Sequence, residues 1–267
     1  MSQWQPLDAA GLTAGLPGIA GPWTAIEVVR QTGSTNADLL ARAAAGAAEG
    51  LVLAAEEQAA GRGRLGRSWV TPPGTALAFS VLLRPSAIPA SRHGWLPLIA
   101  GISAAAAARA VSGVDARLKW PNDVLIGDGK VAGILAEAAG DAVVIGIGMN
   151  VLTGSGELPA GPGGLRPTSL LAAGAPVARE AVLTAILRAL GERYERFRAN
   201  PDPKGCGLLA EYHDLSATAG QDIRVEFPGG AVLAGHAAGI DDDGRLLVVT
   251  ADGEEHAIAA GDVIHLR

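Results

Sequence analysis

The stretch GRGRLGRSWV at residues 61–70 concentrates side chains that are suited to binding anions. Arg62, Arg64 and Arg67 alternate with glycines, no acid interrupts them, and Trp69 follows. Guanidinium groups stay charged and bind carboxylates or phosphates through paired hydrogen bonds. Glycines let the backbone approach a ligand closely. Because three like charges on one short loop repel one another, we expect a mobile loop that orders when an anionic ligand binds.

The same stretch satisfies the dinucleotide-binding pattern G-x-G-x-x-G by letter, but its context argues against that function. A genuine fingerprint continues into a helix whose N-terminus receives the pyrophosphate. Here residues 72–74 read Pro-Pro-Gly, which stops any helix. A protein-kinase glycine loop fails as well, because Ser68 stands where valine is expected and the sequence has no HRD or DFG. The bland alternative is a solvated basic turn beside a core tryptophan.

Three further clusters combine turn residues with polar or charged groups. In KWPND (119–123), Asn122 and Asp123 can bond backbone or hold a metal, although a plain hairpin corner would also explain Asn122. In GDGKVAGIL the lysine, Lys130, lies between a glycine turn and a buried strand, without the spacing of a P-loop. In GIGMN, Gly146 and Gly148 interrupt a strand, as glycines do where a ligand comes close.

Other kinds of site find no support in the sequence. The five histidines show no metal-ligand spacing, and the single cysteine, Cys206, excludes an intrachain disulfide and a cysteine-based metal cluster. No Ser-His-Asp grouping or G-x-S-x-G motif occurs. The net charge of −6 argues against a general nucleic-acid binder and makes a small anionic ligand the better partner for the basic loop, residues 61–70.

Composition and length predict a folded, cytoplasmic protein without a membrane span. Nearly half of the 267 residues are apolar (49%), which suits a large domain and a small one. The N-terminus lacks the basic start of a targeting peptide, since the first basic residue is Arg30. The longest apolar run, LIAGISAAAAARAV, is short for a span and contains Arg109, so we expect a buried helix.

Periodicity predicts an α+β fold with a mixed sheet. Strands are expected at EVVRQT, LVLAAEEQ, TALAFSVLL, RLKW, VLIG, VAGILAEA and AVVIGIGMNV. Helices are expected at TNADLLARAAAG, opened by a capping box of Thr35 and Asp38, and at PLIAGISAAAAARAVSG, AREAVLTAILRALGERYERF and GLLAEYHDLS. This order of strands and helices differs from a regular βαβ alternation.

Three segments are expected along the chain. Residues 1–22, rich in Gly, Pro and Ala, are expected to form a flexible leader, and residues 23–217 the larger domain that carries the clusters described above. Residues 218–267 are expected to form a small β-barrel of four short strands with glycine turns.

Taken together, GSTN, EEQAAGRGRLGRSW, KWPND, GKVAGILAE and GIGMN occur in one order over residues 33–150, and this order resembles the biotin protein ligases. The resemblance implies a catalytic domain of the biotin/lipoate ligase type with a C-terminal SH3-like β-barrel. It also implies a two-step reaction. The carboxylate of biotin attacks the α-phosphate of MgATP to give biotinoyl-5′-AMP and pyrophosphate, and a lysine of a biotin carboxyl carrier domain then takes the biotin.

The resemblance implies site residues as well. Catalytic roles fall to Arg64, Arg67, Lys130 and Asp123, with Asp123 also the candidate for Mg²⁺. Biotin would be bound by Ser34, Thr35, Asn36, Gln58, Gly61, Arg62, Gly63, Arg64, Lys130, Gly133, Gly146 and Gly148. ATP would be bound by Arg64, Arg67, Trp69, Lys119, Asn122, Lys130 and Asn150.

Partners and alternatives follow from the same comparison. Some family members carry an N-terminal DNA-binding domain, for which the segment before the catalytic region is too short here, so we expect no DNA binding. We also expect no membrane binding, and a monomer or weak homodimer. The nearest alternative is a lipoate or octanoate protein ligase, although polar Ser34, Thr35 and Gln58 favour the ureido ring of biotin. A non-enzymatic biotin-binding regulator is the other alternative.

Overall fold

The computed structural model describes residues 5–154, 156, 158 and 165–266, so residues 1–4 of the expected leader lie outside the described part. The larger sheet has the strand order β1-β2-β3-β7-β6-β5-β4, with β8 paired to β6. β1 runs parallel to β2 and β8 parallel to β6, while the other pairs are antiparallel, so the predicted mixed sheet is confirmed. Its strands are β1 (Ala25–Thr32), β2 (Leu51–Gln58), β3 (Ala76–Leu83), β4 (Ala116–Lys119), β5 (Asp123–Ile126), β6 (Gly129–Ala139), β7 (Ala142–Asn150) and β8 (Arg166–Pro167).

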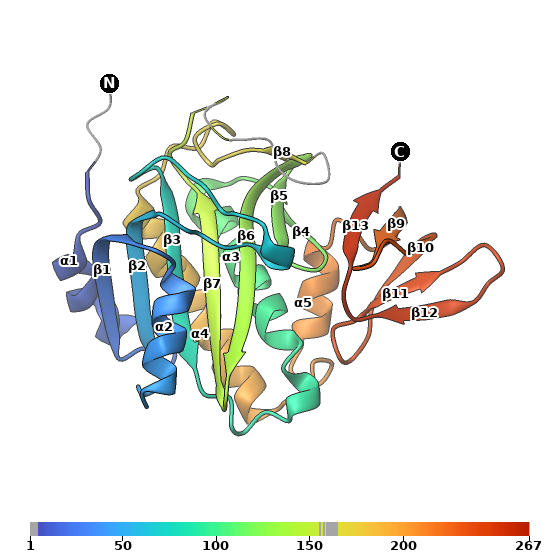
Figure 1. The fold of residues 1–267 in the computed structure, drawn as a ribbon, viewed down its shortest axis with the longest axis horizontal. Coiled ribbons are helices and arrows are strands. Elements are labelled where there is room, and N and C mark those ends of the chain that lie inside the picture. The colour runs from blue at the N-terminus through green and yellow to red at the C-terminus, as the bar shows by residue number, and fades with distance from the viewer. Residues whose placement is uncertain (1–4, 155, 157, 159–164, 267) are drawn as a thin grey trace.

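Helices cover both faces of this sheet (Figure 1). α2 packs on β3 and β7 from one side, and α3, which packs against α4, lies on the other. Successive residues of β3 therefore join different cores: Val81 packs with α3 and α4, and Leu82 packs with α2. A strand buried on both faces reads as a continuous apolar run. The helices are α1 (Ala9–Gly15), α2 (Thr35–Ala44), α3 (Trp95–Ser112), α4 (Arg179–Ala199) and α5 (Leu208–Leu215), with short 3₁₀ turns at Leu16–Gly18, Arg64–Gly66 and Ala90–Arg92.

The apolar run expected to be a buried helix is α3. The segment Ala90–Ser112 is long and apolar enough to cross a membrane by length and composition, but 67% of its most apolar window is buried. Such burial is what the core helix of a globular protein shows, and Gly113 ends the helix in a left-handed conformation as glycine at that position permits.

The N-terminal segment corrects the expectation of a flexible leader. Asp8 caps α1 by accepting a hydrogen bond from the amide of Gly11, and Leu7, Leu12 and Leu16 are buried in the main core. Abundant Ala and Gly hide the apolar spacing of this helix in the sequence. Residues 5–22 are therefore part of the folded domain.

The C-terminal part forms a separate antiparallel sheet, drawn in red in Figure 1, with the order β12-β11-β10-β9-β13. It holds five strands, one more than predicted, because the short segment Asp262–His265 pairs with β9. The closed SH3-like barrel stays a prediction. The strands are β9 (Asp222–Glu226), β10 (Val232–Ile240), β11 (Leu246–Val249), β12 (Glu255–Ile258) and β13 (Asp262–His265).

Candidate active site

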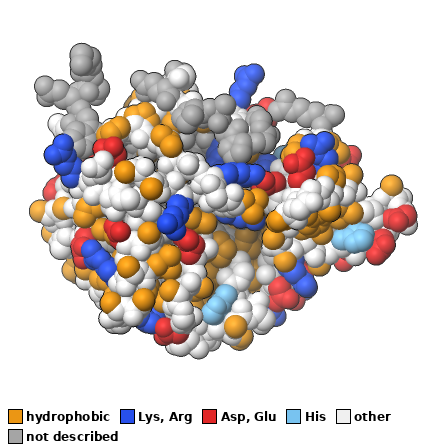
Figure 2. Space-filling view, viewed as in Figure 1, with side chains coloured by type: hydrophobic (Ala, Val, Ile, Leu, Met, Phe, Trp, Pro, Cys, Tyr) orange, Lys and Arg blue, Asp and Glu red, His pale blue; other side chains and the backbone are white. Residues whose placement is uncertain are grey.

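One pocket collects nearly all of the predicted site residues. It lies over β6 and β7, beneath the basic loop, and β13 of the C-terminal sheet closes one side. Figure 2 shows Lys and Arg side chains gathered above a hollow between the larger part of the molecule and the C-terminal sheet. The predicted residues that line the pocket are Ser34, Thr35, Asn36, Gln58, Arg62, Gly63, Arg64, Arg67, Trp69, Lys119, Asn122, Asp123, Lys130, Gly133, Gly146, Gly148 and Asn150.

The basic loop folds back on itself as a small hairpin. The amide of Gly63 donates to the carbonyl of Arg67, and the amide of Trp69 donates to the carbonyl of Gly61. At the tip, Leu65 has φ 56° and Gly66 has φ 72°, which places an exposed leucine in the left-handed region. Gly61 itself is outside the pocket lining, where a Cβ atom would lie 2.3 Å from the carbonyl oxygen of Trp69. Gly61 therefore closes the hairpin.

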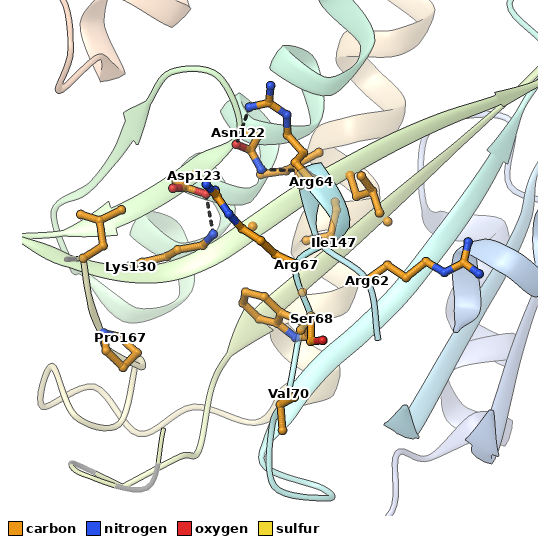
Figure 3. A pocket seen from close by; sticks show the side chains of 18 of the residues that line it. Arg62, Arg64, Arg67, Ser68, Val70, Asn122, Asp123, Lys130, Ile147 and Pro167 are labelled. Atoms are coloured by element: carbon orange, nitrogen blue, oxygen red, sulfur yellow. Dashed lines mark hydrogen bonds and ion pairs between the residues drawn. The ribbon is translucent and has the colours of Figure 1, made fainter. Parts of the chain in front are cut away.

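Four cations line one end of the pocket: Arg64, Arg67, Lys119 and Lys130, here called the cation cluster. Lys130 Nζ lies 2.6 Å from Asp123 Oδ1, and Arg64 donates to Asn122 Oδ1 at 3.2 Å (Figure 3). Lys119 is buried, and desolvation lowers the pKa of its ammonium while the charge of Asp123 opposes the shift. The cluster has four positive charges and only a few carboxylates beside it, which suits a polyanionic ligand.

Arg67 reaches across to the C-terminal sheet. Its guanidinium forms a two-pronged ion pair with Asp262 on β13, with Nη1 donating to Oδ1 at 3.2 Å. Asp262 is paired across the strands with Glu226, which also lines the pocket. The C-terminal sheet thus supplies acids to the cation cluster, which sequence reasoning missed because they lie far along the chain and carry no motif.

Arg62 differs from the other two arginines of the loop. Its guanidinium points away from Lys130 in Figure 3, and its Nη1 lies 4.0 Å from Glu137 Oε1 on β6. The side chain is 56% exposed. Arg62 therefore lies beside Glu137 at the opposite end of the pocket from Lys130, and its expected contact with biotin stays a prediction.

That opposite end is built from amides and hydroxyls. Gln58 Oε1, at the end of β2, accepts the backbone amide of Thr35 at 2.9 Å. The side chain of Thr35 lies 2.7 Å from Ser80 Oγ, and Ser80 donates to Asn36 Oδ1 at 2.6 Å. Ser80 is fully buried on β3 behind the lining residues, and nothing in its local sequence marks it.

Helix α2 presents Thr35 and Asn36 to the pocket in its first turn, and its cap differs from the predicted capping box. Ser34, rather than Thr35, is the N-cap and accepts the amide of Ala37 at 3.5 Å, and Asp38 instead accepts the hydroxyl of Thr32. As the first helical residue, Thr35 keeps its hydroxyl for the pocket.

The glycines of β6 and β7 make room for side chains of the protein itself. A Cβ at Gly146 would lie 2.2 Å from Asn36 Oδ1, and one at Gly148 would lie 2.4 Å from the ring of Trp69. Gly133, which pairs with Gly148 across the strands, faces Lys130 and the same ring. These glycines therefore let the indole of Trp69 approach the sheet closely.

Apart from Asp123 Oδ1, which has the ion pair with Lys130, two polar atoms of the pocket are buried without a hydrogen-bond partner among the described residues. They are Trp69 Nε1 and Asn150 Oδ1, a donor and an acceptor. The other end of the Asn150 amide donates to the carbonyl of Thr168 at 2.9 Å, which fixes the direction of Oδ1. Buried polar atoms left unpaired in this way cost free energy unless a ligand satisfies them.

Comparison with known proteins agrees with this geometry. Residues 28–150 match the biotin/lipoate A/B protein ligase family, and residues 218–266 match the biotin protein ligase C-terminal domain. The chain is 44% identical to the biotin–[acetyl-CoA-carboxylase] ligase of Mycobacterium tuberculosis, over 98% of this chain and 97% of the relative. The chain belongs to the biotin protein ligase family.

Other relatives and a solved structure extend the likeness. A bifunctional ligase/repressor of Bacillus subtilis is 33% identical over 78% of this chain and 64% of its own length. The biotin protein ligase of Aquifex aeolicus, solved in complex with biotin and ATP, superposes with a TM-score of 0.78 at 26% identity, covering 90% of this chain and 99% of that one.

Proposed function

We propose that this protein is an ATP-dependent biotin protein ligase that makes biotinoyl-5′-AMP and transfers biotin to a lysine of a carrier domain. The observation that carries the proposal is the division of one pocket into two ends. Amides and hydroxyls around Thr35 suit a neutral ring with polar edges, and the cation cluster suits a carboxylate beside a triphosphate. The membership of the family supports the same reaction.

In the first step, a carboxylate oxygen of biotin forms a bond to the α-phosphorus of ATP and the bond to the bridging oxygen breaks, so pyrophosphate leaves. Both reactants are anions, so their approach requires neutralising charge, which is the role proposed for Arg64, Arg67 and Lys130. Holding the two groups in line in one pocket supplies much of the remaining rate.

In the second step, the neutral amine of an acceptor lysine attacks the acyl carbon of the adenylate, and the bond to the phosphate oxygen breaks to release AMP. Asp123 is proposed to orient that amine, because its carboxylate already holds an ammonium group, that of Lys130, at 2.6 Å. The hairpin of the basic loop is proposed to shield the adenylate from water.

The adenine of ATP is proposed to lie beside Trp69 and Asn150. The indole offers a stacking face, and the unpaired Asn150 Oδ1 is an acceptor suited to the exocyclic amino group of adenine. A bound base would relieve the cost of leaving that oxygen buried without a partner.

Magnesium is proposed to enter with ATP rather than at a site of the protein. The described residues contain no group of three or more His, Cys, Asp or Glu side chains that could hold a metal ion, and Asp123 is already paired with Lys130. Mg²⁺ is commonly bound through substrate phosphates and few carboxylates, so it is written here as part of the substrate.

The proposed partner is a biotin carboxyl carrier domain, with the enzyme acting in the cytoplasm as a monomer or weak homodimer. The proposal includes no binding to DNA or to membranes. Lysine transfer needs only an acceptor whose side chain can enter the pocket beside Asp123.

The decisive experiment incubates the protein with biotin, MgATP and a carboxyl carrier domain and probes the carrier with streptavidin. We expect covalent biotin on the carrier, and ATP–pyrophosphate exchange that depends on biotin. Exchange driven by lipoate or octanoate instead of biotin would overturn the assignment. Binding of biotin without any AMP release would mean a non-enzymatic regulator.

A matched pair of variants tests the role of the cation cluster. Lys130→Ala should lower the exchange rate by about a hundredfold or more, because it removes one charge next to the reacting phosphate. Lys204→Ala, which removes a lysine paired with Asp242 away from the pocket, should keep the wild-type rate. Equal rates for the two variants would contradict the proposed role of Lys130.

A further inference from the structure

A chain of hydrogen bonds behind the amide-and-hydroxyl end of the pocket has a fixed direction, set by its far end. Asn36 Nδ2 lies 3.2 Å from the carbonyl oxygen of Leu135 and 2.8 Å from Glu137 Oε2. Both of these oxygens can only accept, because the first is a main-chain carbonyl and the second a carboxylate. The NH₂ group of Asn36 must therefore face them, and its Oδ1 must face Ser80.

The orientation of Asn36 also fixes which hydrogen bonds Ser80 donates and accepts. Ser80 Oγ lies 2.6 Å from Asn36 Oδ1, and since that oxygen can only accept, the single hydroxyl hydrogen of Ser80 is committed to it. At the 2.7 Å contact between Ser80 and Thr35, the serine oxygen can then only accept. Thr35 is the donor in this contact.

The consequence appears at the pocket wall. Thr35 also lies 3.2 Å from Gln58 Oε1, but its one hydrogen is taken by the shorter contact to Ser80, and Gln58 Oε1 already accepts the Thr35 amide. Toward a ligand, the hydroxyl oxygen of Thr35 can therefore only accept a hydrogen bond. The Gln58 amide, whose oxygen faces Thr35, has Nε2 as its donor end.

We propose that Ser80 is a positioning residue that, with Asn36 and Glu137 behind it, fixes Thr35 as an acceptor for a ring N–H of the ligand. This inference rests on the proposed function and names how the site selects its substrate. A cyclic urea has N–H groups beside a carbonyl, so it matches an acceptor at Thr35 next to a donor at Gln58. An acyl chain without N–H groups gains nothing from that arrangement.

Burial makes the direction hard to reverse. Ser80 is fully buried, and Thr35 and Asn36 are each 3% exposed, so water cannot supply an alternative partner to the chain. Reversing one bond would leave two acceptors facing each other, such as Ser80 Oγ and Asn36 Oδ1, and in a buried network that cost is not screened. Glu137 is the solvent-exposed end of this chain of hydrogen bonds, with a side chain that is 29% exposed and lies near Arg62.

The test is a double-mutant cycle on biotin affinity, measured by calorimetry. Thr35→Val removes the hydroxyl at constant size and should weaken biotin binding by roughly tenfold. Ser80→Ala should weaken it by several-fold, because the Thr35 hydroxyl loses its buried acceptor and is free to rotate, toward Gln58 Oε1 at 3.2 Å or toward the ligand. In the double variant the Ser80 change should add nothing, since its effect passes only through Thr35.

Controls separate this role from a merely structural one. Ser103→Ala removes another fully buried serine hydroxyl, one that bonds the carbonyl of Ile99 within α3, and should leave biotin affinity unchanged. The affinity for ATP should stay the same in Ser80→Ala. A loss of ATP affinity equal to the loss of biotin affinity, or additive effects in the cycle, would overturn the proposal.

A second pair of variants avoids the buried core. At the half-buried position 137, Glu137→Met removes the accepting oxygens and should weaken biotin, while Glu137→Gln keeps one and should restore most of the affinity. Equal biotin affinities for these two variants would contradict the proposed role of Glu137 in orienting Asn36, Ser80 and Thr35. If the wild-type protein itself binds no biotin, the proposed function fails. If it binds and activates biotin while the cycle is additive, only this inference fails.

Discussion

Lys119 is buried at the cation cluster, and this burial has a measurable consequence for pH dependence. Desolvation lowers its pKa, so the ammonium loses its proton at a lower pH than an ordinary lysine, whose pKa is about 10.4. The charge that would hold the triphosphate is present below the lowered pKa and lost above it. We expect kcat/KM for ATP, which reports the free enzyme, to fall on the alkaline side of the profile.

The check is the variant Lys119→Arg, whose guanidinium stays charged throughout. Its alkaline limb should move to higher pH, whatever its absolute rate. An unchanged alkaline limb would assign the titration to another group.

Residues that belong to a compact motif were predictable one by one. The unusual local composition of the basic loop and of KWPND indicates a binding function, and residues of both line the pocket. Ser80 and Asp262 could not be found this way. Each is an ordinary residue in its own segment, and only the folded sheets bring it to Asn36 or Arg67.

At the scale of elements, a buried ion pair joins the N-terminal segment to β2 and α4. Arg179 Nη1 donates to Glu56 Oε2 at 2.6 Å, and both side chains are at most 4% exposed. The amide of Leu7 donates to the other oxygen of Glu56, and Arg179 also donates to the carbonyl of Gln5. These contacts hold residues 5–8 near the end of β2, because Glu56 lies two residues before the pocket residue Gln58.

Removing one partner should be costly because it leaves the other charge buried and unpaired. We expect Arg179→Met to lower the free energy of unfolding by about 3–5 kcal/mol in urea titrations. Arg117→Ala, which breaks an exposed pair with Asp115, should cost less than about 1 kcal/mol. A loss below 1 kcal/mol for Arg179→Met would show that the N-terminal segment contributes little.

The same elements show where sequence patterns succeed. The strands buried on both faces and the long helices were predicted because apolar runs and 3.6-residue spacing survive in them. Helix α1 was missed because seven residues rich in Ala and Gly give almost no contrast between faces. Strand β13 was also missed, although β11 and β12, which have the same length of four residues, were predicted.

At the scale of the whole molecule, the ion pair of Arg67 with Asp262 connects the two sheets through the basic loop. Asp262→Asn should loosen this loop, because the two-pronged ion pair becomes at most one hydrogen bond from the guanidinium of Arg67 to a neutral amide oxygen. The pair is partly exposed, at 39% and 27%, so we expect only about 1 kcal/mol, or roughly fivefold faster amide exchange at Arg67.

Salt provides the control for that measurement. Raising the ionic strength should speed exchange at Arg67 in the wild-type protein and have little effect in the variant, because screening weakens only the charged pair. Equal salt sensitivity in both would mean that Asp262 does not hold the loop.

The placement of Trp69 gives the molecule an optical signal of its own. The indole groups of Trp23, Trp95 and Trp120 are buried, and each donates to a main-chain carbonyl away from the pocket. Trp69 lines the pocket, 5.7 Å from Lys130 Nζ, with its own N–H unpaired. A nucleotide that covers this ring should change its fluorescence against an almost constant background from those three. Substrate capture could then be timed in unlabelled protein, and Trp69→Phe should abolish the change.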